Sequence, residues 1–272
     1  VDYLKLTAGY DVSGNDDIDY YAARSYFKAK ELLTSISALS FSNVGNTKIQ
    51  WETTKRFNAG FEGNFINNRL NVKFNYFKSK TNNLLTYQTL GFLSGLEKNW
   101  SNGGSLKNEG FDVTATAKLF VSKNWQWELG GSMGHYVNKI TSLPDNETYF
   151  DTEIYGGTVR TSVGNSAGLF YGYKTLGVFS TSEEAKAAAG SNNDPKGLYI
   201  LGSNGITKSY FGAGDIHFAD LDGNGKIDNN DRTVIGNPNP DIYGNIFTTL
   251  AYKHFKLDIN FNYCLGNDVY NY

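Results

Sequence analysis

Strict alternation of apolar and polar side chains is the feature that most limits how this chain can fold. From residue 57 to 65 the odd positions are apolar or glycine and the even positions are glycine, amide or acid; from residue 70 to 76 the apolar residues take the even positions. A period of two residues is typical of a β-strand with one apolar face. Asn67-Asn68 separates the two runs and favours a tight turn, because asparagine tolerates a positive φ.

A two-residue turn at this place decides which residues lie opposite each other. The predicted opposite pairs are Phe65 with Leu70, Gly63 with Val72, Phe61 with Phe74, and Ala59 with Tyr76. This register places the large apolar groups of both strands on one face of the hairpin. Amide and charged groups occupy the other face.

Two more hairpins repeat the pattern. The first runs from Phe111 to Met133 around a short turn, and the second runs from Ile246 to Tyr263 with its turn at Lys253-His254. The sequence therefore predicts an antiparallel, all-β chain.

Alternation of this kind fits either a soluble two-layer sandwich or a membrane barrel with its apolar face turned outward. The predicted strands reach about ten residues, which is enough to cross a bilayer. The connections between strands are short at one end of the predicted sheet and long at the other end. At the long end we expect extracellular loops at residues 141–165 and 180–240. Aromatic residues beside the short turns fit an interfacial girdle, although they also fit ordinary core packing. They are Trp125, Trp127, Tyr252 and Phe255.

Composition excludes several other classes. No run of 18 apolar residues is present and the mean hydropathy is −0.43, so no transmembrane helix is expected. With 25 basic and 27 acidic residues and no Lys/Arg-rich run, nucleic acid is not an expected partner. The loop carboxylates Asp145, Glu147, Asp151 and Glu153 are expected to be solvated rather than catalytic, so an enzyme is not predicted.

Residues 220–231, DLDGNGKIDNND, have the spacing of a twelve-residue calcium loop. The predicted metal ligands are Asp220, Asp222, Asn224, the carbonyl of Lys226, Asp228 and Asp231. Aspartate at the last position reaches the ion less easily than glutamate, which favours weaker binding. Pro238 and Pro240 exclude a following helix, so a sensor of the helix-loop-helix type is not expected. Two readings stay open here: a structural Ca²⁺ site that braces a long loop, or a solvated turn without an ion.

Five segments resemble the SusC/RagA family of TonB-dependent outer-membrane transporters, in the order of that family. They read LKLTAGYDVSGNDDI, IQWETTKRFNAGFEGNFINNRLNVKFNYFKSKTNNLL, NGGSLKNEGFDVTATAKL, VGNSAGLFYGYKTLGVFSTSEEA and DLDGNGKIDNNDRTVIGNPNPDIYGNIFTTLAYKHFKLDINFNYCLGNDVYN. The last is the most specific, since it joins an acidic loop, a GNPNP turn and the strand pair around YKHF. Nothing in this chain resembles the plug, and the terminal strands of the family have no counterpart after Tyr272.

The resemblance implies that residues 1–272 are part of one large antiparallel transmembrane β-barrel domain of about 22 strands. It further implies a protein of the bacterial outer membrane that imports bulky nutrients, either oligosaccharides or oligopeptides. TonB would act through the plug region, and a SusD-like surface lipoprotein would close the extracellular side. Two alternatives remain: a secreted, calcium-stabilised β-rich binding protein, and a passive outer-membrane porin.

Overall fold

The computed structural model describes residues 1–18, 20–32, 36–89, 98–188, 190 and 194–271 of the 272. Residues 189 and 191–193 of the predicted 180–240 loop lie outside the described residues. The chain forms two compact units. Unit 1 comprises Val1–Phe150, Thr161–Ala167 and Asn239–Asn267, and unit 2 comprises Asp151–Arg160, Gly168–Pro238 and Asp268–Tyr272.

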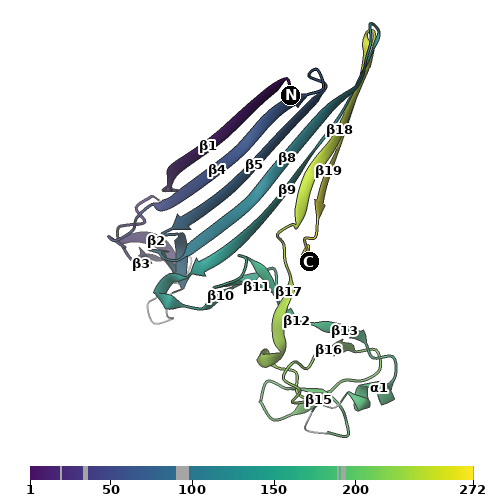
Figure 1. Cartoon of the computed structure of the whole chain (residues 1–272). Coiled ribbons are helices and arrows are strands. Elements are labelled where there is room, and N and C mark those ends of the chain that lie inside the picture. Colours follow the sequence, from purple (N-terminus) through teal and green to yellow (C-terminus); the bar gives the residue numbers. More distant parts are fainter. Residues whose placement is uncertain (19, 33–35, 90–97, 189, 191–193, 272) are drawn as a thin grey trace. The chain divides into compact units, whose positions relative to one another are not determined.

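Unit 1 is built on one seven-stranded antiparallel sheet, which Figure 1 shows as a single layer of long strands. Each strand has 11 to 18 residues, as many as a bilayer crossing needs. In sheet order the strands are β1 (Tyr3–Asn15), β4 (Glu52–Phe65), β5 (Leu70–Asn82), β8 (Ser105–Val121), β9 (Trp125–Ser142), β18 (Ile242–Tyr252) and β19 (Phe255–Leu265).

Two small hairpins and a short helix complete unit 1. They are β2 (Tyr26–Leu32) with β3 (Ile36–Asn43), β6 (Leu85–Thr89) with β7 (Lys98–Asn102), and the 3-10 helix η2 (Pro144–Asn146). The tight turns β4–β5, β8–β9 and β18–β19 all lie at one end of the large sheet, and β2 and β3 lie at the other (Figure 1). We call these the short-turn end and the long-loop end.

The predicted register of the β4–β5 hairpin is confirmed for all four opposite pairs. Asn67 and Asn68 have positive φ as expected, and Ile66 does as well. The predicted length of the turn is wrong, because four residues, 66–69, lie between the paired Phe65 and Leu70. The turn at Lys253-His254 is also confirmed, with Tyr252 opposite Phe255. Between β8 and β9 the pairing shifts from Lys118–Glu128 to Phe120–Trp127, so Leu119 falls in a β-bulge that the regular alternation did not predict.

The two faces of this sheet differ in the way the alternation predicts. On the apolar face, large side chains of the inner strands are exposed: Leu129 of β9 by 40%, and Ile246 and Leu250 of β18 by 53% and 37%. A two-layer sandwich would seal these groups between packed sheets. The predicted all-β antiparallel architecture is therefore confirmed, and its apolar face is left exposed, as on the lipid-facing side of a membrane barrel.

Unit 2 carries short strands and one helix. A four-stranded sheet, whose first two strands begin or end in unit 1, is formed by β10 (Tyr149–Ile154), β11 (Gly157–Ser162), β12 (Leu169–Tyr173) and β17 (Arg232–Gly236). The remaining elements are β13 (Thr175–Val178) paired with β16 (Ile216–Phe218), β14 (Tyr199–Leu201) paired with β15 (Lys208–Tyr210), α1 (Ser182–Ala187) and the 3-10 helix η3 (Asn229–Asp231).

A small hydrophobic core holds unit 2 together. Its buried members are Phe179, Ala185, Leu198 and Ile227, with Tyr173, Phe211 and Phe218 packed around them. Helix α1 begins where the Thr181 hydroxyl accepts the N–H of Glu184 at 3.1 Å, which is a standard N-cap. The helices in the part of the chain that the structure describes are all too short or too polar to cross a bilayer. That residues 141–165 and 180–240 are extracellular loops of one barrel domain stays a prediction.

Candidate functional site

The acidic loop of residues 220–231 connects β16 to β17 in unit 2. Its curl is made by backbone N–H groups that turn inward to the carboxylate of Asp220: Oδ1 accepts the N–H of Asn224 at 3.1 Å and Oδ2 accepts that of Gly225 at 2.6 Å. Gly223 and Gly225 have φ of 69° and 79°, which glycine adopts without strain. The glycine positions of the sequence pattern therefore close the loop.

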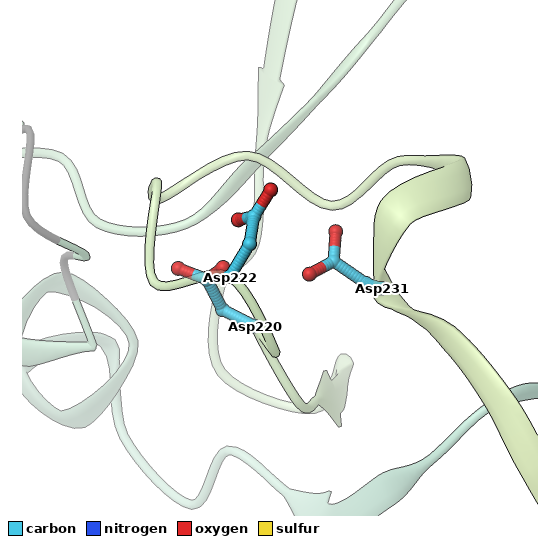
Figure 2. A group of neighbouring side chains, drawn as sticks. All are labelled: Asp220, Asp222 and Asp231. Carbon is cyan, nitrogen blue, oxygen red and sulfur yellow. The ribbon is translucent and has the colours of Figure 1, made fainter.

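Three carboxylates meet in this loop. Ligand oxygens of Asp220, Asp222 and Asp231 all lie within 4.8 Å of one another, and Figure 2 shows the three side chains gathered around a common space. Asp231 is fully buried and Asp222 is exposed. Three anionic oxygen donors at this spacing match the ligand chemistry of a hard divalent cation such as Ca²⁺.

Asp231 is held in place by the backbone. Its Oδ1 accepts the N–H of Leu221 and its Oδ2 accepts that of Asp228, each at 2.8 Å. Asp228 in turn caps η3 through its own side chain, which completes a reciprocal capping box. The last acidic position of the loop is thus rigid and turned toward the first ones.

The other predicted ligands lie differently. The carboxylate of Asp228 is 2.5 Å from Nζ of Lys226, and this hydrogen bond lowers the pKa of Asp228 and raises that of Lys226. The side-chain oxygen of Asn224 accepts the N–H of Lys226 at 2.7 Å, and its amide nitrogen donates to Asp222 at 2.8 Å. The structure brings together Asp220, Asp222 and Asp231, and places Asp228 outside that group.

Gly190 is a neighbour of the loop that the sequence pattern does not reveal. A Cβ at this position would lie 2.2 Å from the nitrogen of Gly225 and 2.6 Å from Oδ2 of Asp220. Only glycine allows the chain after α1 to pass so close.

The polar face of the large sheet is a second candidate surface. Its side chains bond across neighbouring strands: Glu62 pairs with Lys73 at 3.1 Å, and the hydroxyl of Ser132 donates to Asn245 at 2.5 Å. Further contacts on this face join Asn71 to Asn64 and Tyr243 to Asp112. A hydrogen-bonded, charged face opposite an apolar one is the lumen side of an outer-membrane barrel.

A pocket of about 450 Å³ in unit 2 forms a third candidate site. The guanidinium carbons of Arg160 and Arg232 lie 3.4 Å and 5.0 Å from the ring centroid of Tyr171, so cations cover this ring. Asp151 binds Arg160 through both carboxylate oxygens, at 2.7 and 2.8 Å. The pocket is lined by Tyr171 and Arg232 together with Ile154, Val159, Phe170, Tyr173, Ile235 and Tyr270.

Arg160 keeps Asp151 ionised. The hydrogen bond from Arg160 holds the pKa of Asp151 below its ordinary value, opposite to what a general acid needs. Sequence reasoning did not find this cluster, because Arg160 and Arg232 are far apart in the chain and no local pattern joins them.

Long antiparallel strands with an exposed apolar face, a polar face and short turns at one end define an outer-membrane β-barrel protein. Residues 2–263 match the family model described as "TonB dependent receptor-like, beta-barrel", and the chain belongs to this family. It is therefore part of a protein of the bacterial outer membrane, in a family of receptors and not of enzymes.

Several curated relatives cover almost all of this chain. TonB-dependent receptor P26 of Formosa agariphila is 30% identical over 274 residues, which are 98% of this chain and 26% of that protein. TonB-dependent receptor SusC of Bacteroides thetaiotaomicron is 25% identical over 284 residues, 98% of this chain and 25% of SusC. The chain spans about a quarter of the length of these relatives.

Solved structures agree on the fold. The RagAB peptide importer in its "closed-closed" state has a TM-score of 0.73 at 23% identity, covering 97% of this chain and 27% of that chain. The "open-open" state gives a TM-score of 0.70 at 21% identity, with 97% and 26% covered. The resemblance to the SusC/RagA family and the fold class of a partial large barrel are confirmed.

Proposed function

We propose that the protein containing this chain imports bulky nutrients, oligosaccharides or oligopeptides, across the outer membrane with energy supplied through TonB. The observation that carries the proposal is the two-faced sheet of unit 1, whose polar face would line a passage for a polar solute. Membership in the TonB-dependent receptor family supports active uptake over passive diffusion.

Substrate class and partner rest on the relatives. RagAB is named as a peptide importer, and its identity to this chain below 25% leaves the choice between peptide and glycan to experiment. The likeness to SusC and RagA supports a SusD-like surface lipoprotein as the partner at the long-loop end.

An uptake assay tests the import proposal. Cells that carry the intact receptor would be compared with a deletion strain for uptake of fluorescent oligosaccharide and oligopeptide mixtures, each with and without functional TonB. We expect uptake of one mixture to require both the receptor and TonB. Receptor-dependent uptake that persists without TonB would favour a passive porin, and uptake of neither mixture would reject the substrate class.

Co-purification tests the partner separately. An affinity-tagged receptor extracted in mild detergent is expected to retain a surface lipoprotein in a stoichiometric amount. Recovery of the receptor alone would reject the partner and leave the import proposal standing.

We further propose that the acidic loop binds one structural Ca²⁺, with carboxylate ligands from Asp220, Asp222 and Asp231 and the remaining oxygens from Asn224, the carbonyl of Lys226, Asp228 or water. The convergence of three carboxylates, one of them fully buried, supports this proposal. A cation would offset the mutual repulsion of these groups and tie β16 to β17. The expected role is to brace a loop whose hydrophobic core is small.

Calcium content of the intact receptor tests the site. Elemental analysis is expected to find one calcium equivalent, lost in Asp222→Ala and kept in Asp194→Ala, which removes a carboxylate elsewhere in unit 2. Asp228→Ala tests whether Asp228 is a ligand. An unchanged calcium content would show that it is not and that its carboxylate is paired with Lys226. Retention of calcium by Asp222→Ala would overturn the assignment.

A further inference from the structure

Four lysines form a row across four neighbouring strands of the large sheet. Lys55 of β4 lies opposite Lys80 of β5, Lys80 lies opposite Lys107 of β8, and Lys107 lies opposite Lys139 of β9. All four are exposed. We call them the lysine row.

The lysine row lies on the apolar face. Lys55 precedes the apolar-face residue Phe57 by two positions, and side chains two apart in a strand share a face. Ser79 and Asn138, which directly precede Lys80 and Lys139, point to the opposite face and are buried. The row therefore continues the surface that we read as lipid-facing, and the inference below rests on that reading rather than on import activity.

The position of the lysine row along the strands matches the edge of the membrane's apolar region. Lys55 and Phe65 are ten positions apart in β4, and Phe65 is the last strand residue before the tight turn. At about 3.4 Å per residue and a strand tilt of about 40°, they are separated by roughly 26 Å along the membrane normal, close to the ~25 Å of an apolar band. Barrel proteins place short turns on the periplasmic side, so the row lies at the extracellular boundary.

The charges of the row are not balanced within the described chain. Like charges directly opposite each other in a sheet are destabilising. One step toward the short-turn end, Lys78 pairs with Glu109 at 2.9 Å, whereas no acidic side chain in the described residues forms an ion pair with any member of the row. Four cations side by side present a surface that an external polyanion would stabilise.

Lysine, a compact point charge, is a good partner for phosphate. The row covers three strand spacings of about 4.8 Å each, or roughly 15 Å, which is wide enough for more than one phosphate group. Below the row the apolar face continues with exposed side chains such as Phe57, which would contact acyl chains. A ligand that carries phosphates above acyl chains matches this order of charge and apolar surface.

We propose that the lysine row binds the phosphate groups of a phosphorylated lipid headgroup in the outer leaflet of the outer membrane, with the lipid's acyl chains on the apolar surface below. The same lysines hold the barrel at a fixed depth in the membrane, with the row at that boundary.

Native mass spectrometry of the intact receptor in detergent, titrated with diphosphoryl lipid A, tests the proposal. Replacing all four lysines by glutamine (K55Q/K80Q/K107Q/K139Q) is expected to weaken lipid binding at least about tenfold, given the contribution of each basic residue near an anionic surface. The four-arginine variant keeps the charge and is expected to bind like the wild type. The matched control K118Q/K123Q/K253Q/K256Q removes four charges near the short-turn end and is also expected to bind like the wild type.

Two further titrations separate the lipid headgroup from other ligands. A phosphate-free lipid with the same acyl chains should bind the wild type and the glutamine variant equally weakly, and inorganic phosphate should not displace lipid A at equal concentration. Should inorganic phosphate bind as strongly as the lipid, or the glutamine variant bind lipid A normally, the proposal is overturned. Normal lipid binding with loss of a co-purifying acidic protein would instead assign the row to a protein partner. If the fourfold variant does not assemble, K55Q/K80Q and K107Q/K139Q provide the same comparison.

Discussion

Phe61 and Phe74 lie directly opposite each other in the β4–β5 hairpin, with stacked rings whose centroids are 5.8 Å apart. Phe111 continues this aromatic contact on β8, at 6.2 Å from Phe74. These rings form part of the apolar face near the middle of the strands. Their surroundings should therefore be lipid rather than protein.

Replacing Phe74 by lysine should destabilise the intact receptor by about 2–4 kcal/mol, because a charge near the bilayer midplane loses its hydration. Asn75→Lys is the matched control, since the neighbouring position faces the polar side and can keep its charge hydrated. Unfolding of each variant by urea in lipid vesicles gives the two free energies. Equal losses at both positions would contradict the assignment of the faces.

Removal of the proposed Ca²⁺ should loosen the acidic loop without unfolding the large sheet. The carboxylates of Asp220, Asp222 and Asp231 would then repel one another, and Asp231 is fully buried. Limited proteolysis of the intact receptor in EDTA is expected to cut within residues 194–231 at least several times faster than in calcium. The same treatment of Asp222→Ala should produce no further change, and equal cleavage rates in the wild type would argue against an ion.

Gly197→Ala should weaken unit 2 more than an ordinary glycine substitution does. Gly197 has a φ of 89°, and a Cβ there would lie 2.1 Å from the carbonyl oxygen of Ala185 in α1. Backbone strain alone costs about 1–3 kcal/mol, and the clash adds to it. Gly205→Ala is the control, because Gly205 also has a positive φ, 68°, but open space around it. Hydrogen exchange of α1 and β14 in the intact receptor measures the difference, and equal protection in both variants would reject the role of the close contact.

The β14–β15 hairpin should lose stability in acid. Hydrogen bonds from Lys208, the N–H of Lys196 and Tyr210 lower the pKa of Asp194 to about 2, from an ordinary value of 3.8. A depressed carboxyl pKa stabilises the folded form above the unfolded pKa, and this contribution disappears as the pH falls from about 4 to about 2. Hydrogen exchange of residues 199–210, corrected for intrinsic rates, is expected to rise across this window.

Asp194→Asn provides the control for that experiment. It removes the titrating group, so exchange should be faster at pH 6 and should no longer respond between pH 4 and pH 2. A wild-type hairpin whose protection is constant over this range would contradict the assigned contact with Lys208.

The sequence by itself determined the long hairpins. Side chains alternate with a period of two, and Asn67-Asn68 and Lys253-His254 accept the backbone angles of tight turns, so strand pairing and the two faces follow from local information. The exposed apolar side chains of β18 and β19 could be expected for the same reason. The bulge at Leu119 could not, because it depends on how β8 fits against β9.

Tertiary structure decided which side chains meet. The spacing in residues 220–231 predicted six ligands, but only the folded loop brings the carboxylates of Asp220, Asp222 and Asp231 together and turns Asp228 to Lys226. Lys55, Lys80, Lys107 and Lys139 have unequal spacings in the sequence. They align because the backbone hydrogen bonds of each strand fix the register of the next strand. A row across four strands therefore exists only once all three strand pairings have formed.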